Sequence, residues 1–243
     1  MVMKNRKKIL IISLTLLASF TCAAETVTKG MKKVIDDALD FSVKQSMSMF
    51  YEMKDQKGIL PRTAENGKMI TCESAWWTSG FYPGTLWYCY EYSNDPQIRA
   101  AAEEMTSRVE KQKYTTSNHD VGFIINCSFG NGYRLTHNET YRKVIETAAK
   151  SLSTRFHPVT GCTRSWNSKK WQFSVIIDNM MNLELLNVAS SLTGDNTYYN
   201  MAKSHADRTM INHFRPDGSS YHVVSYDTIT GKVLNQVTHQ GVN

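Results

Sequence analysis

The chain has 243 residues and a formal net charge of +6, from 28 Lys and Arg against 22 Asp and Glu. Four of the basic residues and none of the acidic ones lie in the first 24 residues, so the remainder has 24 basic against 22 acidic residues, or +2. Because no basic stripe appears later in the chain, the high isoelectric point does not indicate a nucleic-acid partner. About 220 residues remain, enough for one large hydrophobic core.

The first 24 residues have the pattern of a secretory signal peptide. A basic start from Lys4 to Lys8 precedes an apolar run from Ile9 to Phe20, and Ala23-Ala24 supplies small residues for cleavage. The apolar run of about 12 residues is too short to span a bilayer. A lipoprotein acylated at Cys22 is the alternative. We therefore expect a bacterial protein secreted across the inner membrane, periplasmic in location, with no transmembrane segment after the signal is removed.

The next segments alternate between apolar and polar helical patterns. Apolar residues recur at three- to five-residue steps from Val27 to Met53, which predicts an amphipathic helix. Gly58 to Arg62 then breaks the chain, and Trp77 to Tyr92 is strongly apolar and aromatic. Asp95-Pro96 is typical of a helix start, with Asp as the N-cap and Pro in the first turn, so we expect a polar helix from there to about Lys113.

Two further pairs of helices follow the same order. We predict apolar helices over 120–135 and 174–192, each followed by a polar helix, over 138–156 and 196–214. The polar helices begin at caps that lie 43 and 58 residues apart, a period of about 50 residues that indicates a solenoid or a closed ring. Helices without a polar face fit an inner ring and those with one fit an outer ring, as in an (α/α) barrel. A plain helical bundle is the alternative.

Beyond Phe214 the pattern changes to short β segments. Tyr221 to Tyr226 and Lys232 to Gln236 flank a turn, which predicts a β-hairpin. At this repeat length the chain supplies about four helical hairpins, fewer than the six that would need about 300 residues. We therefore expect residues 25–243 to be the N-terminal part of a single barrel domain in a longer protein.

Four cysteines lie outside the leader. Their spacing matches no metal-binding pattern, and the sequence has no haem or phosphate-loop signature, so we expect no metal and no cofactor. An oxidising compartment permits disulfides, yet Cys89 and Cys127 lie in apolar helical runs, where a buried free thiol is the commoner state. The pairing therefore remains open. The four are Cys72, Cys89, Cys127 and Cys162.

Two carboxylates stand out because each lies in an apolar segment. Asp178 lies among isoleucines and methionines, and Asp120 precedes the apolar run Val121 to Ile125. Desolvation disfavours the ionised form of such a group and raises its pKa towards the range in which it can donate a proton. The alternative for Asp178 is a helix N-terminus, where it would interact with free backbone N–H groups. Two acids of this kind suggest a glycosidase-type site.

Five segments, in order, resemble the unsaturated glucuronyl hydrolases, glycoside hydrolase family 88. This resemblance implies an all-α (α/α)6 barrel, incomplete here, that removes the 4,5-unsaturated uronic acid from the non-reducing end of lyase-generated glycosaminoglycan oligosaccharides, by protonation and hydration of the enol-ether double bond. The alternatives are a pectin-directed hydrolase like those of family 105 and a non-catalytic sugar-binding barrel. The segments are Trp77–Trp87, Asn118–Phe123, Ile176–Leu183, Ser220–His222 and Thr238–Gly241.

The same resemblance implies roles for individual residues. Asp178 is the expected acid/base, and Asp120 the second carboxylate, which holds the sugar hydroxyls and the Asp178 proton in place. The expected substrate contacts are Trp77, His119, His222 and Gln240. The residues alone leave other interpretations open: core packing for the tryptophan, a hydrogen-bonded inner-ring histidine, and an exposed hairpin histidine. We expect His205 and His213, on an outer helix, to be solvated. The family's downstream segment, with a further Arg and Trp for the site, is absent.

Overall fold

The computed structural model describes residues 28–240. The predicted signal peptide, with Cys22, lies outside the described residues. Contacts divide the chain between Phe41 and Ser42 into two compact units. In its described part, the first unit is the beginning of helix α2 (Lys29–Met53), which confirms the amphipathic helix predicted there. No helix within 28–240 is long and apolar enough to cross a membrane.

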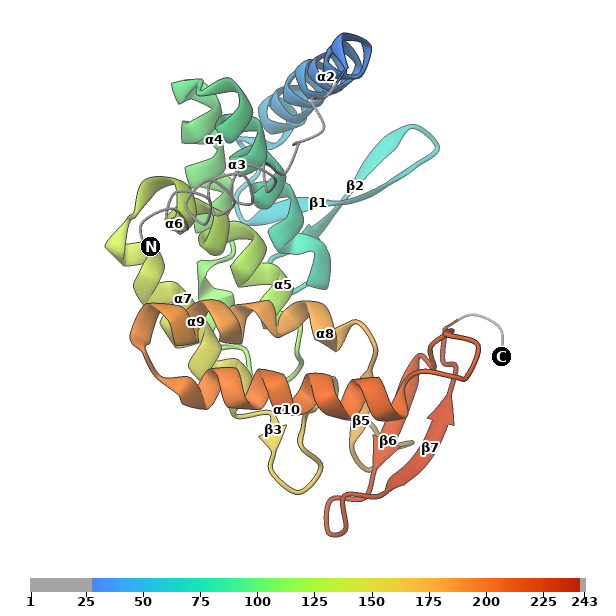
Figure 1. Ribbon diagram of the computed structural model, residues 1–243. Coiled ribbons are helices and arrows are strands. Elements are labelled where there is room, and N and C mark those ends of the chain that lie inside the picture. Colours follow the sequence, from blue (N-terminus) through green and yellow to red (C-terminus); the bar gives the residue numbers. More distant parts are fainter. Residues whose placement is uncertain (1–27, 241–243) are drawn as a thin grey trace, which may run out of the picture. The chain divides into compact units, whose positions relative to one another are not determined.

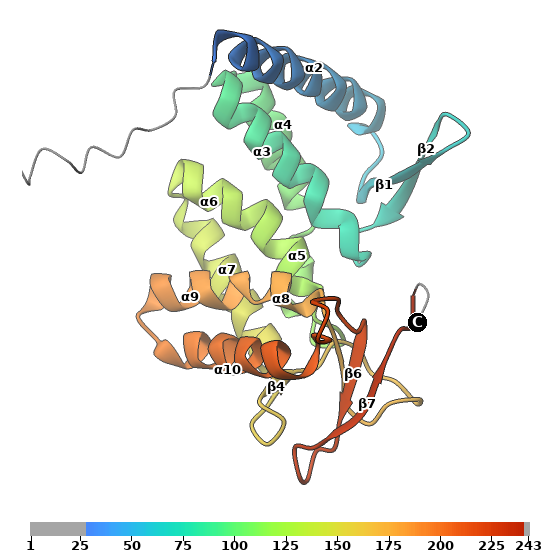
Figure 2. The same ribbon diagram turned by 45° about the vertical axis from the view of Figure 1, so that its right-hand side comes forward.

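The second unit contains the predicted helical pairs. The apolar helix α3 (Phe81–Ser93) follows the 3-10 turn η1 (Trp77–Gly80) and pairs with the polar helix α4 (Pro96–Ser107). Helix α9 (Glu184–Thr193) lies beside α10 (Asn196–Asn212) in the same way, as both ribbon views show (Figures 1 and 2).

The middle pair has an interrupted inner helix. The predicted helix over 120–135 consists of α5 (Val121–Ile125), the π-helical turn η3 (Asn126–Gly130) and α6 (Asn131–Thr136). Its outer partner is α7 (Glu139–Ser153). The polar helix predicted to run to about Lys113 ends at Ser107. A second 3-10 turn, η2 (Glu110–Tyr114), follows it and precedes α5.

Side-chain caps begin the three outer helices. Asp95 accepts a hydrogen bond from the backbone N–H of Gln97 at 2.8 Å, and the amide oxygen of Asn138 accepts one two residues further on at 2.9 Å. The third cap is Asp195 and not Asn196 as predicted, and its carboxylate accepts a hydrogen bond from the backbone N–H of Thr197 at 2.8 Å. Gly194 precedes it at φ +75°, which ends α9 and frees Asp195 to cap α10.

The prediction of one helix over 174–192 is wrong at its start. Ser174–Ile176 forms strand β5, the short helix α8 spans Asn179–Asn182, and α9 follows. The strand pairs antiparallel with β6 (Val223–Tyr226), which in turn pairs with β7 (Val233–Val237). The predicted C-terminal hairpin is therefore confirmed, and a third strand joins it. A short apolar run fits a buried strand as well as a helix, and here its pairing with β6 makes it a strand.

The segment predicted to break the chain near Gly58 is a β-hairpin. Strand β1 (Ile59–Glu65) pairs antiparallel with β2 (Lys68–Glu73) around the turn Asn66-Gly67, whose φ angles are +50° and +73°. Asn-Gly is a strong hairpin signal because both residues adopt positive φ readily. A second short pair, β3 (Phe156–His157) with β4 (Cys162–Thr163), follows α7.

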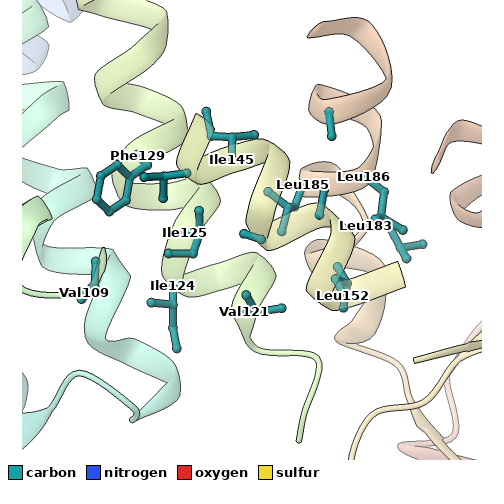
Figure 3. Packing of buried hydrophobic residues seen from close by; sticks show 14 of the residues in the cluster. Val109, Val121, Ile124, Ile125, Phe129, Ile145, Leu152, Leu183, Leu185 and Leu186 are labelled. Carbon is teal, nitrogen blue, oxygen red and sulfur yellow. The ribbon is translucent and has the colours of Figure 1, made fainter. Parts of the chain in front are cut away.

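The largest core cluster lies between the inner and outer helices of the second unit. Figure 3 shows α5 and η3 contributing Val121, Ile125 and Phe129, opposite Ile145 of α7 and Leu185 of α9. Each fully buried side chain of this size stabilises the fold by about 1.5–3 kcal/mol. These contacts fix the inner segments against one another.

Two glycines allow the inner segments to approach closely. A Cβ on Gly84 of α3 would lie 2.6 Å from the carbonyl oxygen of Cys127, and one on Gly122 would lie 2.6 Å from the Cα of Asn182. Backbone atoms line both contacts, so a larger residue would push α3 from η3, or α5 from α8. The second contact sets the position of the candidate site.

Candidate active site

The two predicted carboxylates lie at the first turns of adjacent helices. Asp120 precedes α5 and Asp178 precedes α8, and the two helices touch where Gly122 meets Asn182. The buried amide oxygen of Asn182 accepts a hydrogen bond from the N–H of Phe123 at 2.7 Å, which locks this contact. As a result, donor atoms of Asp120, Asp178 and His119 all lie within 4.8 Å of one another. The structure thus brings the predicted acid pair together.

Both carboxyls have raised pKa values. Burial raises the pKa of Asp120 to about 6, the neighbouring Asp178 charge raises it further, and the Arg155 guanidinium opposes the shift. Burial also raises the pKa of Asp178 to about 6, against the backbone N–H groups of Asp178 and Asn179. Two acids this close titrate as a pair, so one proton is shared between them near pH 6.

Asp178 is at a helix N-terminus, as the alternative interpretation has it, but its side chain makes no capping hydrogen bond. Its Oδ1 is buried and has no hydrogen-bond partner within the described part of the chain. An unsatisfied buried carboxyl oxygen is expensive, and such groups concentrate where chemistry requires them. Asp178 therefore lies at a helix N-terminus without a capping hydrogen bond from its side chain, and its role stays a prediction.

His119 lies beneath Asp120 and not on the open surface. Its side chain is 1% exposed, and its Nε2 lies 3.3 Å from Oδ1 of Asp120. Burial lowers the pKa of His119 to about 3, so the imidazole is neutral at physiological pH. Neither ring nitrogen has a hydrogen-bond partner among residues 28–240, so the alternative of a hydrogen-bonded inner-ring histidine is not met, and the substrate contact stays a prediction.

Ser165 connects the two carboxylate-bearing segments, and sequence reasoning missed it. Its carbonyl accepts from the N–H of His119 at 3.0 Å, while its Oγ accepts from the N–H of Ile176 at 2.9 Å and from the Asn179 amide at 3.3 Å. Ser165 and Asn179 are fully buried. One serine therefore holds the residue before Asp120 and the residues flanking Asp178 in a single network. Buried serines have no sequence signature that reveals such a role.

Trp77 does not lie in the core. It is 43% exposed, and its ring packs edge-on against Phe81, with the centroids 5.7 Å apart, and tilted against Phe123, at 6.2 Å. Phe123 follows Asp120 by three residues, so an accessible aromatic surface begins at the helix that carries the acid. The core-packing interpretation of Trp77 is wrong.

His222 belongs to a second aromatic group and is not an isolated hairpin residue. Its ring stacks on His239 with centroids 6.2 Å apart and planes at 3°, and Trp166 meets both rings edge-on. The N–H of Gln240 lies 3.4 Å from Nδ1 of His222. Trp166 forms a β-bridge with Asn118, two residues before Asp120, which links this group to the acid pair. Sequence reasoning missed Trp166 and His239.

The prediction that His205 and His213 are solvated is wrong, because both are fully buried. Nδ1 of His205 accepts from the N–H of Thr163 at 2.9 Å, and Nε2 of His213 lies 3.2 Å from the carbonyl of Val175. The face of α10 that carries them packs on strands that the helical pattern does not reveal. Burial lowers the pKa of His205 to about 3 and that of His213 to about 4.

The four cysteines outside the leader form no disulfide and are all free thiols. Cys89 and Cys162 are buried, and Cys72 and Cys127 are half-buried. Burial raises the pKa of the Cys127 thiol to about 11 and that of Cys162 to about 12. These thiols stay protonated and are poor nucleophiles. Within 28–240, His119 and the two carboxylates are the group whose donor atoms lie close enough to hold a metal ion, although the chemistry predicted for the site needs none.

Comparison with known proteins decides the family. No family model matches the chain. An unsaturated glucuronyl hydrolase of Formosa agariphila is 48% identical over 168 residues, which are 68% of this chain and 42% of that relative. The crystal structure of an unsaturated glucuronyl hydrolase specific for heparin matches with a TM-score of 0.79 and 43% identity, over 85% of this chain and 57% of that one. The chain belongs to the unsaturated glucuronyl hydrolase family.

A further relative extends the match along the chain. An unsaturated chondroitin disaccharide hydrolase of Streptococcus pyogenes is 34% identical over 214 residues, which are 85% of this chain and 53% of that relative. The chain spans about half the length of the curated relatives it matches. The helical pairs of this unsaturated glucuronyl hydrolase family member are accordingly part of an (α/α)6 barrel, which confirms the predicted fold class.

Proposed function

We propose that the protein is a glycoside hydrolase that removes the 4,5-unsaturated uronic acid from the non-reducing end of lyase-generated glycosaminoglycan oligosaccharides. The observation that carries the proposal is the convergence of two desolvated carboxyls, Asp120 and Asp178, within 4.8 Å. Their pKa values of about 6 keep a proton on the pair near pH 6, about two units above the usual range of an Asp carboxyl. A group with this pKa can both donate and accept a proton, which the hydration of a double bond requires.

Asp178 is the proposed proton donor of the pair. The guanidinium of Arg155 favours the ionised form of Asp120, whereas Oδ1 of Asp178 has no hydrogen-bond partner in the described chain. The shared proton therefore resides mainly on Asp178, and Asp120 remains free to accept hydrogen bonds from sugar hydroxyls.

The reaction needs one acid/base acting twice. Asp178 transfers its proton to C4 of the enol ether, which leaves positive charge at C5 and the ring oxygen. Water then adds at C5 and gives a proton back to the Asp178 carboxylate. The resulting hemiketal opens, and the glycosidic bond breaks as the leaving sugar takes a proton. This route differs from ordinary glycoside hydrolysis, in which a second carboxylate attacks or activates water at the anomeric carbon.

The two aromatic groups are the proposed sugar contacts. Trp77 presents a half-exposed ring beside Phe123, and His222 with Gln240 lies in the group built around Trp166. Flat aromatic faces pack against the apolar faces of sugar rings, and neighbouring polar groups bind the hydroxyls and the carboxylate. Both groups connect to the segment that carries Asp120, one through Phe123 and one through Asn118.

Relatives named for glucuronyl and chondroitin substrates favour glycosaminoglycan fragments over the pectin fragments of the family 105 alternative. A non-catalytic sugar-binding barrel would not need two carboxyls held in a desolvated place at a cost in stability. We further propose export to the periplasm, supported by the basic and apolar segments of residues 1–24.

The test is a direct assay of the full-length protein on lyase-generated unsaturated disaccharides of chondroitin, heparin and pectin. Hydration removes the conjugated double bond, so ultraviolet absorbance should fall with time on the first two substrates. Asp178→Asn is the matched control, because it keeps the size of the side chain but cannot transfer the proton. Loss of absorbance on the pectin fragment alone would favour the family 105 alternative, and saturable binding without any loss would favour the sugar-binding barrel.

A further inference from the structure

A small cavity has a lining that includes none of the predicted site residues. Its volume is about 240 Å³, and it is lined by the loops on either side of β3 and β4 together with Thr116. Its polar lining residues include Arg155, Arg164, His157 and Asn167, and Phe173 forms an apolar wall. No sequence pattern groups these residues, and the proposed hydrolysis does not use the cavity.

The cavity holds two guanidiniums without a carboxylate partner. Arg155 is 8% exposed and donates to neutral carbonyl groups: that of Thr116 at 2.6 Å, that of Arg164 at 2.8 Å and that of Ser165 at 3.3 Å. Within 28–240 the arginine ion pairs are made by other arginines, namely Arg99, Arg108, Arg134 and Arg142. Proteins rarely bury a charge without a counter-charge, because its desolvation is not repaid.

The two guanidiniums also repel each other. Burial and, after it, the charge of Arg164 lower the pKa of Arg155 to about 10, while Asp120 opposes the shift. Hydrogen bonds to carbonyl oxygens satisfy the N–H groups of Arg155 without neutralising its charge. Asp120 is therefore the one counter-charge that acts on Arg155 among the causes of its shift, and an anion in the cavity would add a second beside both guanidiniums.

Two buried nitrogen atoms at the cavity have no partner in the described chain. They are Nε of Arg164 and Nδ1 of His157. The Arg164 side chain is otherwise held by a hydrogen bond from its Nη2 to the carbonyl of Gln172 and by the ring of Phe173, 5.3 Å from its guanidinium carbon. His157 packs edge-on against the same ring at 5.7 Å. Both nitrogens are thus fixed in place, with unused hydrogen-bonding capacity.

We propose that this cavity binds a small oxyanion of the size of sulfate or phosphate, held by Arg155, Arg164 and His157. Guanidinium N–H groups form short, charge-assisted hydrogen bonds with such oxygens. Asn167 supplies a further polar group on the same lining. Since a water molecule occupies about 30 Å³ in the liquid, the cavity has room for the anion and several waters. The proposal does not depend on the proposed hydrolysis.

The test is a titration of the full chain with sodium sulfate, with chloride adjusted to hold the ionic strength constant. The probe is the Nε–H signal of Arg155 and Arg164 in ¹⁵N-labelled protein. Both signals should shift together and saturate in the millimolar range. In Arg164→Gln, loss of a charge-assisted donor should weaken sulfate binding about tenfold or more.

Arg208→Gln is the matched control. Arg208 also donates only to carbonyls, of Thr160 at 3.0 Å and Gly231 at 2.8 Å, but it does not line the cavity. Its substitution should leave sulfate binding unchanged. If Arg164→Gln fails to fold, Asn167→Ala, at an exposed position, replaces it, with weakening of two- to threefold expected for a lost neutral hydrogen bond.

A parallel titration with a sulfated monosaccharide separates two sources of the anion. Saturation by inorganic sulfate supports a site for the free ion, and saturation by the sugar sulfate alone supports a site for an anionic group on a glycan. The absence of saturation with either, or equal weakening in Arg164→Gln and Arg208→Gln, would overturn the proposal.

Discussion

Asp178→Asn should stabilise the folded protein at neutral pH while it abolishes turnover. The folded-state pKa of Asp178 is raised from 3.8 to about 6. An acid with a raised pKa costs no stability below its unfolded pKa, an increasing amount as pH rises towards 6, and the full amount above that. A shift of about two units corresponds to about 3 kcal/mol at most. Because Asp178 is partly open to solvent and Asn keeps one polar oxygen there, we expect a gain of about 1–2 kcal/mol.

The assay is urea unfolding of the full-length protein at pH 7.5 and pH 5. At pH 5 part of the Asp178 population is protonated in the folded state, so the gain should fall to about half. Turnover of unsaturated disaccharides should fall by a factor on the order of 10²–10⁴ or more, as expected for loss of an acid/base. Asp207→Asn, at an exposed site paired with Lys203, is the control and should change stability by less than about 0.5 kcal/mol. A less stable Asp178→Asn protein, or an equal gain at both pH values, would refute the desolvation argument, and normal turnover would refute the assigned role.

Three further results are expected. Ser165→Ala leaves the N–H of Ile176 and the Asn179 amide short of an acceptor, so it should lower the free energy of unfolding by about 1–3 kcal/mol and lower kcat more than it changes KM; an unchanged kcat would remove Ser165 from the positioning network. His205 and His213 have pKa values below that of an unfolded histidine, so their contribution to stability is complete above pH 6.5 and is lost as pH falls below it. The loss is about 1.4 kcal/mol per pH unit for each histidine. His205→Gln should reduce this acid sensitivity in fluorescence-monitored unfolding, and an unchanged dependence of stability on pH would contradict the argument. Residues 25–243 expressed alone should aggregate or self-associate and lack activity, because a groove of about 930 Å³ between α3 and α9 exposes apolar side chains, among them Phe81, Val188 and Leu192, between polar ones. A monodisperse, cooperatively melting and active product would contradict this.

Local signals in the sequence were enough to predict the helical pairs. The Asp95 and Asn138 caps lie at the predicted positions, and the third cap is one residue away, because Asx side chains at helix starts act within two or three residues of the chain. The acid pair could also be predicted, since each carboxylate lies next to an apolar run. The sequence predicts helix at strand β5 because its short apolar run, Val175 to Ile177, fits either structure, and the strand that decides, β6, lies almost 50 residues further on.

Residues that act through distant backbone groups could not be predicted. Arg155 is linked to Thr116, 39 residues earlier, and Ser165 to Ile176, 11 residues later, through carbonyl and N–H groups that every residue carries. The burial of His205 and His213 likewise depends on strands packed against α10. The Asn66-Gly67 hairpin differs from these cases, since its turn signal was present in the sequence and was overlooked.

Gly122 has no functional group, yet its contact with Asn182 influences the chemistry of the two carboxylates. With a hydrogen atom where other residues have a carbon, α5 and α8 meet backbone to backbone, and the carboxylates at their first turns come within reach of each other. Any side chain at position 122 would act as a spacer between the two helices. Burial is the main cause of the raised pKa of Asp120, and the charge of Asp178 adds a part that falls as the distance between the two carboxylates grows. The size of residue 122, two positions after Asp120, therefore affects the pKa of the carboxyl pair by setting the distance between α5 and α8.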